Sequence, residues 1–220
     1  ITGASSGIGK AVALKISKEK THLILSGRNR QELENVAGIC EKNGSEATVL
    51  PFDLGDEDAV NAAASQVISM HKKLDALYHF GGISQRSFAS ETPLFVDRKI
   101  FEVNYFGTIA LVKAILPEMI KNGGGHLAVT SSIVGKFGFP YRSSYSASKH
   151  ALHGFFESLR AENVQHNIRV SIIIPGRIKT NISINAVNSE GKAHAKMDEG
   201  QNHGMAAEKS AEIICKKLKQ

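Results

Sequence analysis

The sequence predicts an α/β fold in which one parallel β-sheet carries helices on both faces. Short apolar segments alternate with longer segments of helical periodicity along the chain, a pattern typical of repeated β-α units. Right-handed crossovers between such units place every strand in one sheet, with helices above and below it. A glycine-rich turn opens the chain, and 20 glycines against 5 prolines suit the tight turns of this fold class.

The composition is that of an ordinary globular protein. Hydrophobic residues make up 42% and charged residues 22% of the 220 residues, a length that suits one domain. The net charge of +6 is scattered except for Lys216, Lys217 and Lys219, so we expect an anionic small ligand and no nucleic acid. Cys40 and Cys215 belong to no ligand-spaced cluster, which predicts free thiols and no metal site.

We expect a single nucleotide-binding domain over residues 1–220, located in the cytoplasm. No composition break or internal repeat divides the chain, no apolar run reaches membrane-spanning length, and no signal peptide is visible. The chain opens on Ile1 directly before a Thr-Gly turn, which indicates a first strand cut short. A membrane anchor or targeting segment upstream of that residue would not be visible in this sequence.

The opening turn, residues 2–9, has three glycines spaced G-x-x-x-G-x-G between a strand and a helix. Gly3 permits the sharp turn, Gly7 lets a diphosphate approach the backbone, and Gly9 lets the helix pack closely on the sheet. The helix start then offers free N–H groups and a positive dipole end to phosphate. The alternative is a turn without a ligand. We interpret the glycine turn as the start of a Rossmann-type, doubly wound sheet. A dinucleotide would bind there at Gly3, Ser5, Ser6, Gly7, Ile8 and Gly9.

The second strand is predicted over residues 22–26, buried on both faces. It ends at Gly27-Arg28, about 20 residues after the glycine turn, where an NAD-binding domain carries a carboxylate for the ribose hydroxyls. This chain has no carboxylate there, and the Arg28 guanidinium matches a 2′-phosphate. The alternative is a surface arginine that begins the next helix. The pattern favours NADP(H) over NAD(H).

The alternation then continues. A helix is predicted over residues 30–42, a third strand over 47–52 and a helix over 56–71. Asp53-Leu54 follows the third strand, where we expect the adenine. The Asp53 side chain could bind the adenine amino group or cap the helix from Asp56 onward, and the sequence leaves both roles open.

The fourth strand, residues 75–80, ends in Gly81-Gly82, and two glycines there suit close passage of the backbone against a cofactor. Residues 97–121 are predicted as one long helix that bears Asn104. The fifth strand, 126–130, leads into Ser132.

The remaining elements are a helix from Tyr145 to about residue 163, a sixth strand over 167–174, a polar stretch to about residue 204, and a last helix over 206–219. Pro175 and Gly176 follow the sixth strand. The stretches singled out lie at the carboxyl ends of strands or on helices leading from them, where ligands bind in such sheets.

Tyr145 and Lys149 project from one helix face, one turn apart. The ammonium favours the phenolate, which makes the phenol a better proton donor or acceptor near neutral pH. Alone, such a pair also occurs by chance on solvated helices.

Taken together, the chain resembles the short-chain dehydrogenase/reductase superfamily, in its core-length, single-domain branch. The resemblance covers nearly the whole chain and rests on T-G-x-x-x-G-I-G at residues 2–9, Asn104, Ser132, Y-x-x-x-K at Tyr145, and Pro175-Gly176. It implies NADP(H), and a small-molecule carbonyl or alcohol substrate. It also implies a homodimer or homotetramer that pairs the helices bearing Asn104 and Tyr145, and we expect outward apolar residues there, such as Phe156.

The resemblance implies a role for each member of a catalytic tetrad. Tyr145 would exchange a proton with the substrate oxygen, which Ser132 would hold. Lys149 and the oxidised nicotinamide would lower the Tyr145 pKa, and Lys149 would also bind the nicotinamide ribose. Asn104 would hold a water that links Lys149 to solvent. Further cofactor contacts are expected from Gly81, Gly82, Pro175, Gly176, Ile178 and Thr180, whereas Arg177 and Lys179 are expected to face solvent.

Two departures from the family pattern stand out. The family usually has Asn-Asn-Ala-Gly where this chain has His79-Phe80-Gly81-Gly82, so the expected strand-end asparagine is lost. Ser6 stands where many NADP-using members carry a basic residue, so NADP preference rests on Arg28 and on the missing acid at Gly27.

The substrate is less defined. Phe137, Phe139 and Tyr141 either line an apolar pocket or pack between elements, and Ile182, Ile184 and Val187 either close as a lid or do the same. We expect a hydrophobic ketone or aldehyde, or the matching alcohol. One alternative is a catalytically weak NADP(H)-binding sensor or scaffold, which the altered residues 79–82 favour. Another is a sugar-nucleotide epimerase or dehydratase, whose usual chain is longer and whose glycine turn is spaced differently.

Overall fold

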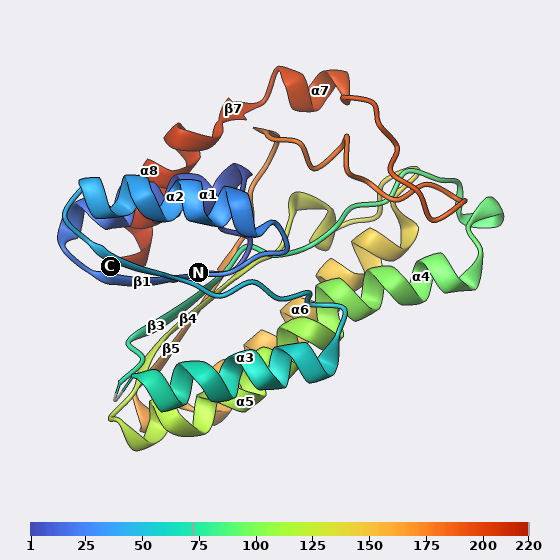
Figure 1. Cartoon of the computed structure of the whole chain (residues 1–220). Helices are drawn as coiled ribbons and strands as arrows, with labels where there is room; N and C mark the ends of the chain where they lie inside the picture. The colour runs from blue at the N-terminus through green and yellow to red at the C-terminus, as the bar shows by residue number, and fades with distance from the viewer. Residues whose placement is uncertain (72, 220) are drawn as a thin grey trace.

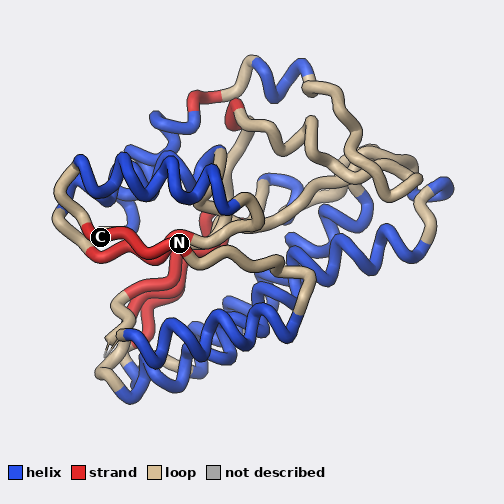
Figure 2. Tube along the Cα trace, viewed as in Figure 1, coloured by secondary structure: helices blue, strands red, loops and turns tan. Residues whose placement is uncertain are grey.

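The parallel strands lie at the centre of the molecule, with helices on both faces (Figures 1 and 2). The computed structural model describes residues 1–71 and 73–219. In these residues β1 pairs with β2, and β3, β4 and β5 pair in that order, all in parallel. The strands are β1 (His22–Leu25), β2 (Glu46–Val49), β3 (Ala76–His79), β4 (Gly125–Thr130) and β5 (Ile168–Ile173).

Thr2 joins the two sets of strands. It forms parallel bridges to Ser26 after β1 and to His79 of β3, so the order is β2, β1, Thr2, β3, β4, β5. The chain therefore winds outwards from Thr2 in both directions, which is the predicted Rossmann-type, doubly wound arrangement. The glycine turn that follows Thr2 lies at the point where the winding reverses, and ligands bind at that point in such sheets.

Two groups of helices bury the two faces of the sheet (Figure 1). On one face α1 contacts both α2 and α8, and on the other α3 contacts α5, while α6 covers β5. The helices are α1 (Gly7–Ile16), α2 (Arg30–Lys42), α3 (Glu57–Met70), α5 (Gly107–Lys121), α6 (Ser143–Glu162) and α8 (Ala207–Leu218). Short 3₁₀ turns lie at Ser17–Glu19, Ala89–Glu91, Ile133–Gly135 and Val164–His166.

The larger hydrophobic core lies between the sheet and helices α3, α5 and α6. Phe156 of α6 belongs to this core and is 1% exposed, in contact with the cluster that includes Leu127 and Leu152. The expectation that Phe156 faces outward is therefore wrong, because the apolar stripe of α6 turns toward the sheet.

Helix α3 begins directly after Asp56, whose side chain accepts a hydrogen bond from the Ala59 N–H at 3.0 Å. Asp53 instead accepts from the Gly55 N–H at 2.9 Å. Asp56 is thus the N-cap, and the alternative in which Asp53 caps this helix is wrong.

The long helix that carries Asn104 is continuous from Leu94 to Lys121 but is not uniform. Two α-helical parts, α4 (Leu94–Phe101) and α5, flank a π-helical turn at Glu102–Phe106. The predicted start at residue 97 was late, because Pro93 ends the preceding loop and Leu94 begins the helix. The extra residue of a π turn shifts the side chains within it relative to the helix faces, and Asn104 lies within this turn.

In the described part of the chain, Leu94–Lys121 is also the one helix long and apolar enough to cross a membrane. We expected no such segment, and by length and composition alone that expectation is not met. The indication is weak, because a core helix passes the same test and Leu111, Ile115 and Met119 pack in the hydrophobic core.

After β5 the chain makes an excursion that sequence periodicity does not predict. It leaves through β6 (Ile178–Lys179), passes α7 (Glu199–Asn202), and returns through β7 (Met205–Ala206), which pairs with β6 in parallel. Strands of two residues are too short to show a period, so this pairing is invisible in the sequence.

Candidate active site

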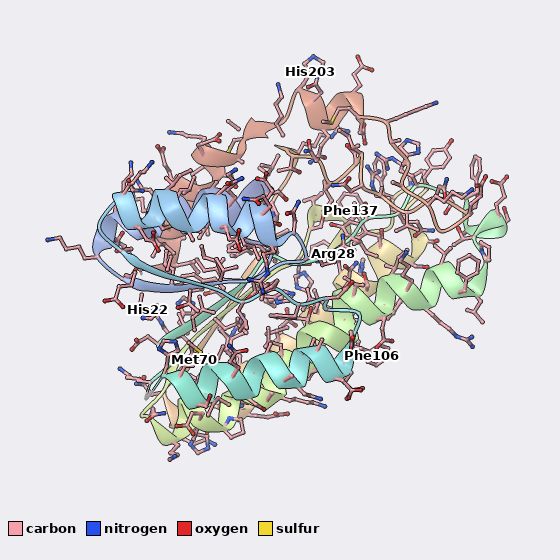
Figure 3. All side chains as sticks on the ribbon, viewed as in Figure 1. His22, Arg28, Met70, Phe106, Phe137 and His203 are labelled. Atoms are coloured by element: carbon pink, nitrogen blue, oxygen red, sulfur yellow. The ribbon has the colours of Figure 1, made fainter. Side chains whose placement is uncertain are left out.

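A cavity of about 590 Å³ opens at the carboxyl ends of the strands. Every predicted site residue except Asn104 lines it, including the glycine turn, Arg28, Tyr145 and Thr180. Figure 3 shows Arg28 and Phe137 on this side of the molecule, whereas Met70 lies at the opposite end, where α3 returns to the strand starts. The sequence did not identify several other lining residues, among them Ser84, Thr130, Arg142, Asn185, Asp198 and Gln201.

The start of α1 faces this cavity with its first turn uncapped. Ser6 is the N-cap residue but makes no side-chain capping bond, and the first turn has no acidic residue. Gly7 has φ +54°, and a Cβ there would lie 3.1 Å from Thr180 Cγ2. A side chain at this position would be strained and would narrow the space between the turn and Thr180. The site therefore fits the diphosphate of a dinucleotide.

Asn104 lies behind the cavity wall and ties two elements together. Its side-chain oxygen accepts from the Ile83 N–H at 2.8 Å, and its amide donates to the Ile83 carbonyl at 2.9 Å. The amide also donates to Ser148 Oγ of α6 at 3.1 Å. Both polar atoms of the Asn104 side chain therefore have protein partners, and its role of holding a water stays a prediction.

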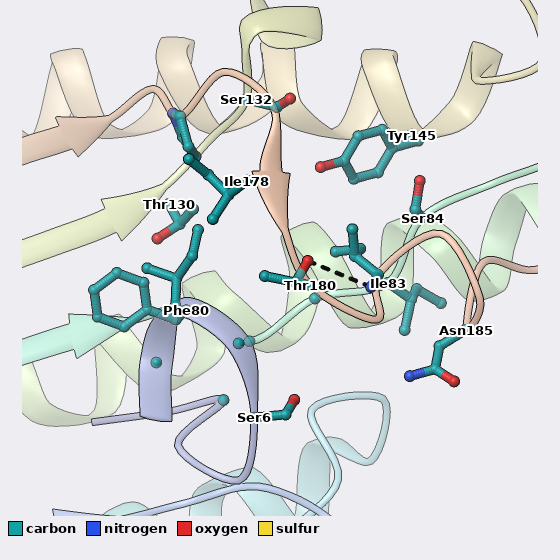
Figure 4. Close-up of a pocket in the computed structure, with 18 of the residues that line it drawn as sticks. Ser6, Phe80, Ile83, Ser84, Thr130, Ser132, Tyr145, Ile178, Thr180 and Asn185 are labelled. Atoms are coloured by element: carbon teal, nitrogen blue, oxygen red, sulfur yellow. Dashed lines mark hydrogen bonds between the residues drawn. The ribbon is translucent and has the colours of Figure 1, made fainter. Parts of the chain in front are cut away.

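Tyr145 and Ser132 project into the same space, on the side of the cavity opposite Ser6 (Figure 4). Burial raises the pKa of Tyr145, while the neighbouring Ser132 hydroxyl and the charge on Arg142 lower it. The sequence predicted a lowered pKa through Lys149. Instead burial has the largest effect in this structure and acts in the opposite direction, and Lys149 is not among the groups that shift the Tyr145 pKa.

Lys149 is buried beside Tyr145. Its Nζ donates to the Thr130 carbonyl at 2.8 Å and lies 5.8 Å from the centre of the Tyr145 ring. Burial lowers the pKa of Lys149 from 10.5 to about 8. The hydroxyl of Thr130 is buried in the same wall without a hydrogen-bond partner in the described residues.

Gln85 positions the start of the helix that carries Tyr145, a role that the sequence did not indicate. Its side-chain oxygen accepts from the backbone N–H groups of Ser144 at 2.8 Å and Tyr145 at 3.2 Å. Its amide donates to Ser143 Oγ at 3.2 Å, and the residue is fully buried. Residue 142 gives this helix no side-chain cap, so Gln85 satisfies N–H groups that a cap would otherwise bind. A distant glutamine has no local sequence signal.

His79 fills the place of the missing family asparagine with a closed network. Thr108 donates to the Asn104 carbonyl at 2.8 Å and so accepts from His79 Nε2, 2.9 Å away. His79 Nδ1 then accepts from Thr2 Oγ1 at 3.0 Å, and Thr2 accepts from the Gly81 N–H at 3.2 Å. A neutral imidazole thus connects the glycine turn to the helix of Asn104.

This network predicts acid sensitivity. Burial, followed by the charge on Lys149, lowers the pKa of His79 from 6.5 to about 3. Below pH 6.5 this histidine takes up a proton in the unfolded chain but not in the folded protein. The free energy of unfolding therefore decreases as the pH falls toward 3. This loss in the free energy of unfolding amounts to about 2 kcal/mol between pH 7 and pH 5. We expect His79→Gln to lose that much less stability over this range, measured by urea unfolding at both pH values.

The control for this experiment is His166→Gln, which changes an exposed histidine and should retain the wild-type pH dependence. If wild type and His79→Gln lost stability in parallel as the pH fell, His79 would not be the titrating group.

At the far end of the cavity Arg28 is well exposed, with 65% of its side chain accessible. Its guanidinium lies 3.9 Å from an oxygen of Asp53, and Gly27 lies against Ser5 of the glycine turn. Arg28 is therefore held loosely beside the turn.

The aromatic and aliphatic candidates for substrate contact divide into two groups. Phe137, Phe139 and Ile182 line the cavity. This agrees with the pocket role considered for the two phenylalanines and with the lid role considered for Ile182. Tyr141 contacts Phe88 outside it, with the rings tilted and their centres 4.5 Å apart, and Val187 is buried in a small cluster with Val96 and Ile100. Val187 therefore packs between elements and does not form part of a lid.

The doubly wound sheet and the uncapped helix start at its switch point define a Rossmann-fold, nucleotide-binding protein. The model of the short chain dehydrogenase family matches residues 1–191, and the chain belongs to this family.

Similar proteins agree with this assignment. The chain is 42% identical over 218 residues to "Dehydrogenase/reductase SDR family protein 7-like" of Drosophila melanogaster, covering 97% of this chain and 67% of that protein. A solved 3-ketoacyl-ACP reductase from Sinorhizobium meliloti is 31% identical with a TM-score of 0.85, covering 98% of this chain and 89% of that one. L-Sorbose reductase from Gluconobacter frateurii, solved with NADPH and L-sorbose, is 26% identical with a TM-score of 0.85, covering 97% and 86%.

Proposed function

We propose that the protein is an NADP(H)-dependent oxidoreductase that interconverts a carbonyl compound and the matching alcohol, with Tyr145 as general acid and base. One observation carries the proposal. A single cavity is lined by the uncapped start of α1, by Arg28 at one end, and by Tyr145, Ser132 and Lys149 at the other. The oxidoreductase family shared with the relatives supports it.

The chain's own residues would hold the cofactor along this cavity. The uncapped N–H groups of the glycine turn would bind the diphosphate, with Thr180 opposite Gly7. Asp53-Leu54 would lie at the adenine, and Pro175, Gly176 and Ile178 would lie at the nicotinamide end with Gly81 and Gly82. NADP(H), when bound, supplies or accepts the hydride.

Tyr145 would donate its proton to the carbonyl oxygen during reduction and take one from the alcohol during oxidation. Ser132, which lines the same cavity beside the phenol, would hold the same oxygen and stabilise the charge that develops there. Lys149 has a pKa of about 8 and can therefore return a proton near neutral pH. Asn104 would act by positioning, since it ties Ile83 to the helix of Tyr145 and Lys149 through Ser148.

The direct test is consumption of NADPH, followed at its absorbance band, with a panel of ketones and aldehydes. Turnover of at least one member supports the proposal. Tight NADPH binding without turnover of any member would favour the alternative, a sensor or scaffold. The altered residues 79–82 favoured that alternative, but His79 supports the site there with a complete hydrogen-bond network.

Cofactor choice gives a separate prediction. We expect Arg28→Ala to weaken NADPH binding about 10- to 100-fold and to leave NADH binding nearly unchanged, because a charge-assisted contact with the 2′-phosphate contributes roughly 1.5–3 kcal/mol. Gly27→Asp should shift the preference further, toward NADH, since a carboxylate repels the 2′-phosphate. Fluorescence titration of each variant with both cofactors measures this.

The matched control is Arg30→Ala, which removes an arginine of equal exposure that pairs with Glu34. Equal losses of NADPH and NADH affinity in Arg28→Ala would overturn the 2′-phosphate assignment.

We also propose association into a homodimer or homotetramer. With Phe156 buried, support for this comes from the exposed Phe106, which lies on the π turn beside Tyr105 of the same helix. Light scattering of the purified protein gives the number of subunits.

A further inference from the structure

Three charged side chains meet at the wall between the cavity and its neighbour. Arg86 and Arg142 both bond the same Asp198 oxygen, Arg142 at 2.8 Å. Arg142 and Asp198 line the 590 Å³ cavity, and all three line an adjoining cavity of about 540 Å³. The side chains of Arg86 and Arg142 are only 12% and 15% exposed, and that of Asp198 is 30% exposed.

The charges in this group do not balance. Two guanidiniums that are largely removed from water share one carboxylate, which leaves a net positive charge in the wall. Glu91 lines the adjoining cavity, but it is exposed and pairs with neither arginine in the described structure. A buried charge without a counter-ion is costly, so this wall favours a second anion.

The arginines also have donors to spare. A guanidinium carries five N–H donors in a planar fork that matches carboxylate and phosphate oxygens. In the part of the chain that the structure describes, each of these two guanidiniums makes one hydrogen bond, the bond to Asp198.

This group lies next to the residues placed at the reacting carbonyl. Arg142 directly precedes the helix that begins at Ser143, and its charge reaches Tyr145, whose pKa it lowers. Arg86 follows Gln85, which binds the Ser144 and Tyr145 N–H groups. An anion bound here would therefore lie within a short molecule's reach of the Tyr145 hydroxyl.

We propose that Arg86 and Arg142 form a subsite for an oxyanion, a carboxylate or a phosphate monoester, carried by the carbonyl substrate, with Asp198 as the resident counter-ion. The inference rests on the proposed function and specifies its substrate class. It modifies the expectation of a purely hydrophobic substrate. Phe137, Phe139 and Ile182 would contact the apolar part of the molecule, and the arginines would bind its charged group.

A structural role for the same group is the competing explanation. Asp198 belongs to the excursion between β6 and β7, so the two ion pairs could serve only to hold that segment against the rest of the protein. In that case the loss of an arginine and the loss of Asp198 would change the binding of an anionic substrate in the same direction. In a substrate subsite, the arginine and the aspartate have opposite effects on an anion.

The experiment compares ketones of one shape that differ in charge: 4-acetylbenzoate, 4-acetylphenyl phosphate and the neutral 4-acetylbenzamide. The measured quantity is the ratio of kcat/KM for each anionic ketone to that for the amide. We expect wild type to favour an anionic ketone, Arg86→Gln to lower the ratio by about 10- to 100-fold, and Asp198→Asn to raise it. Whichever anion has the larger ratio identifies the oxyanion.

Arg98→Gln removes the same charge from an exposed position outside both cavities, and it should keep the wild-type ratio. Equal ratios in wild type, Arg86→Gln and Asp198→Asn would overturn the subsite. A fall of the ratio in both Arg86→Gln and Asp198→Asn would also overturn it and would favour the structural role.

A binding measurement separates failure of the subsite from failure of the proposed function. If no ketone is turned over, thermal unfolding with NADP⁺ present is followed with added benzoate, phenyl phosphate or benzamide. A higher Tm with an anion than with benzamide in wild type, lost in Arg86→Gln, supports the subsite even without turnover. No difference between the anions and benzamide would overturn it.

Discussion

Replacement of Tyr145 by Phe is expected to lower kcat by at least about 100-fold, the lower range for general acid-base catalysis. The phenol is buried against Ser132, so the change removes the proton donor and leaves the ring and its packing in place. NADPH affinity should stay nearly intact, because the glycine turn and Arg28 are unaffected. Single-turnover kinetics and a cofactor titration on the same preparation measure the two quantities.

Tyr141→Phe is the matched control. It removes the same hydroxyl from an exposed ring that contacts Phe88 outside the main cavity, and it should retain the wild-type kcat. Near-normal turnover by Tyr145→Phe would exclude Tyr145 as the acid-base group.

Two adjacent serines should differ in their effects when each is changed to alanine. Ser132→Ala removes a hydroxyl that lies beside Tyr145 in the cavity and accepts a weak bond from the Val134 N–H at 3.4 Å. We expect its kcat to fall by about 10²- to 10³-fold, the usual effect of one oxyanion donor, with little change in Tm. Steady-state kinetics and calorimetry give both values.

Ser131→Ala should do the reverse. Ser131 Oγ is buried and bonds His153 Nε2 at 2.9 Å and the Lys149 carbonyl at 3.3 Å, so its loss leaves a buried ring nitrogen without a partner. We expect a stability loss of about 1–3 kcal/mol and a smaller effect on kcat than in Ser132→Ala. Similar kcat losses in both variants would indicate that Ser132 acts through local structure instead of through the substrate.

Features that depend on local pattern could be predicted from the sequence. The alternation of strands and helices follows from periodicity, and α2 was predicted with both of its observed ends because its apolar residues repeat at helical spacing. The structure adds that Asn29 caps it. The glycine turn could be predicted because its spacing reflects local backbone geometry. All the predicted site residues but Asn104 line one cavity, since they lie at the carboxyl ends of parallel strands or on helices leading from them.

Features that depend on a partner distant in sequence could not be predicted. Gln85 caps a helix 58 residues further on, and no pattern near either residue records this. The direction in which Phe156 points depends on how α6 lies on the sheet. The helix was therefore predicted correctly, but Phe156 was predicted on its outer face instead of in the core. The Tyr145 pKa shows the same limit, because neighbouring charges can be read from spacing but burial cannot.

The pairing of β6 with β7 has a consequence for how this protein can be modified. The excursion between them leaves and returns at adjacent points, because Ile178 pairs with Met205 and Lys179 with Ala206. A segment whose ends are pinned side by side can change in length at small entropic cost, since loop closure depends only weakly on loop length. Residues 181–204 can therefore be exchanged as a cassette for those of a relative, with the sheet and the cofactor end of the cavity left in place. Such chimaeras would allow substrate preference to diversify without loss of the fold.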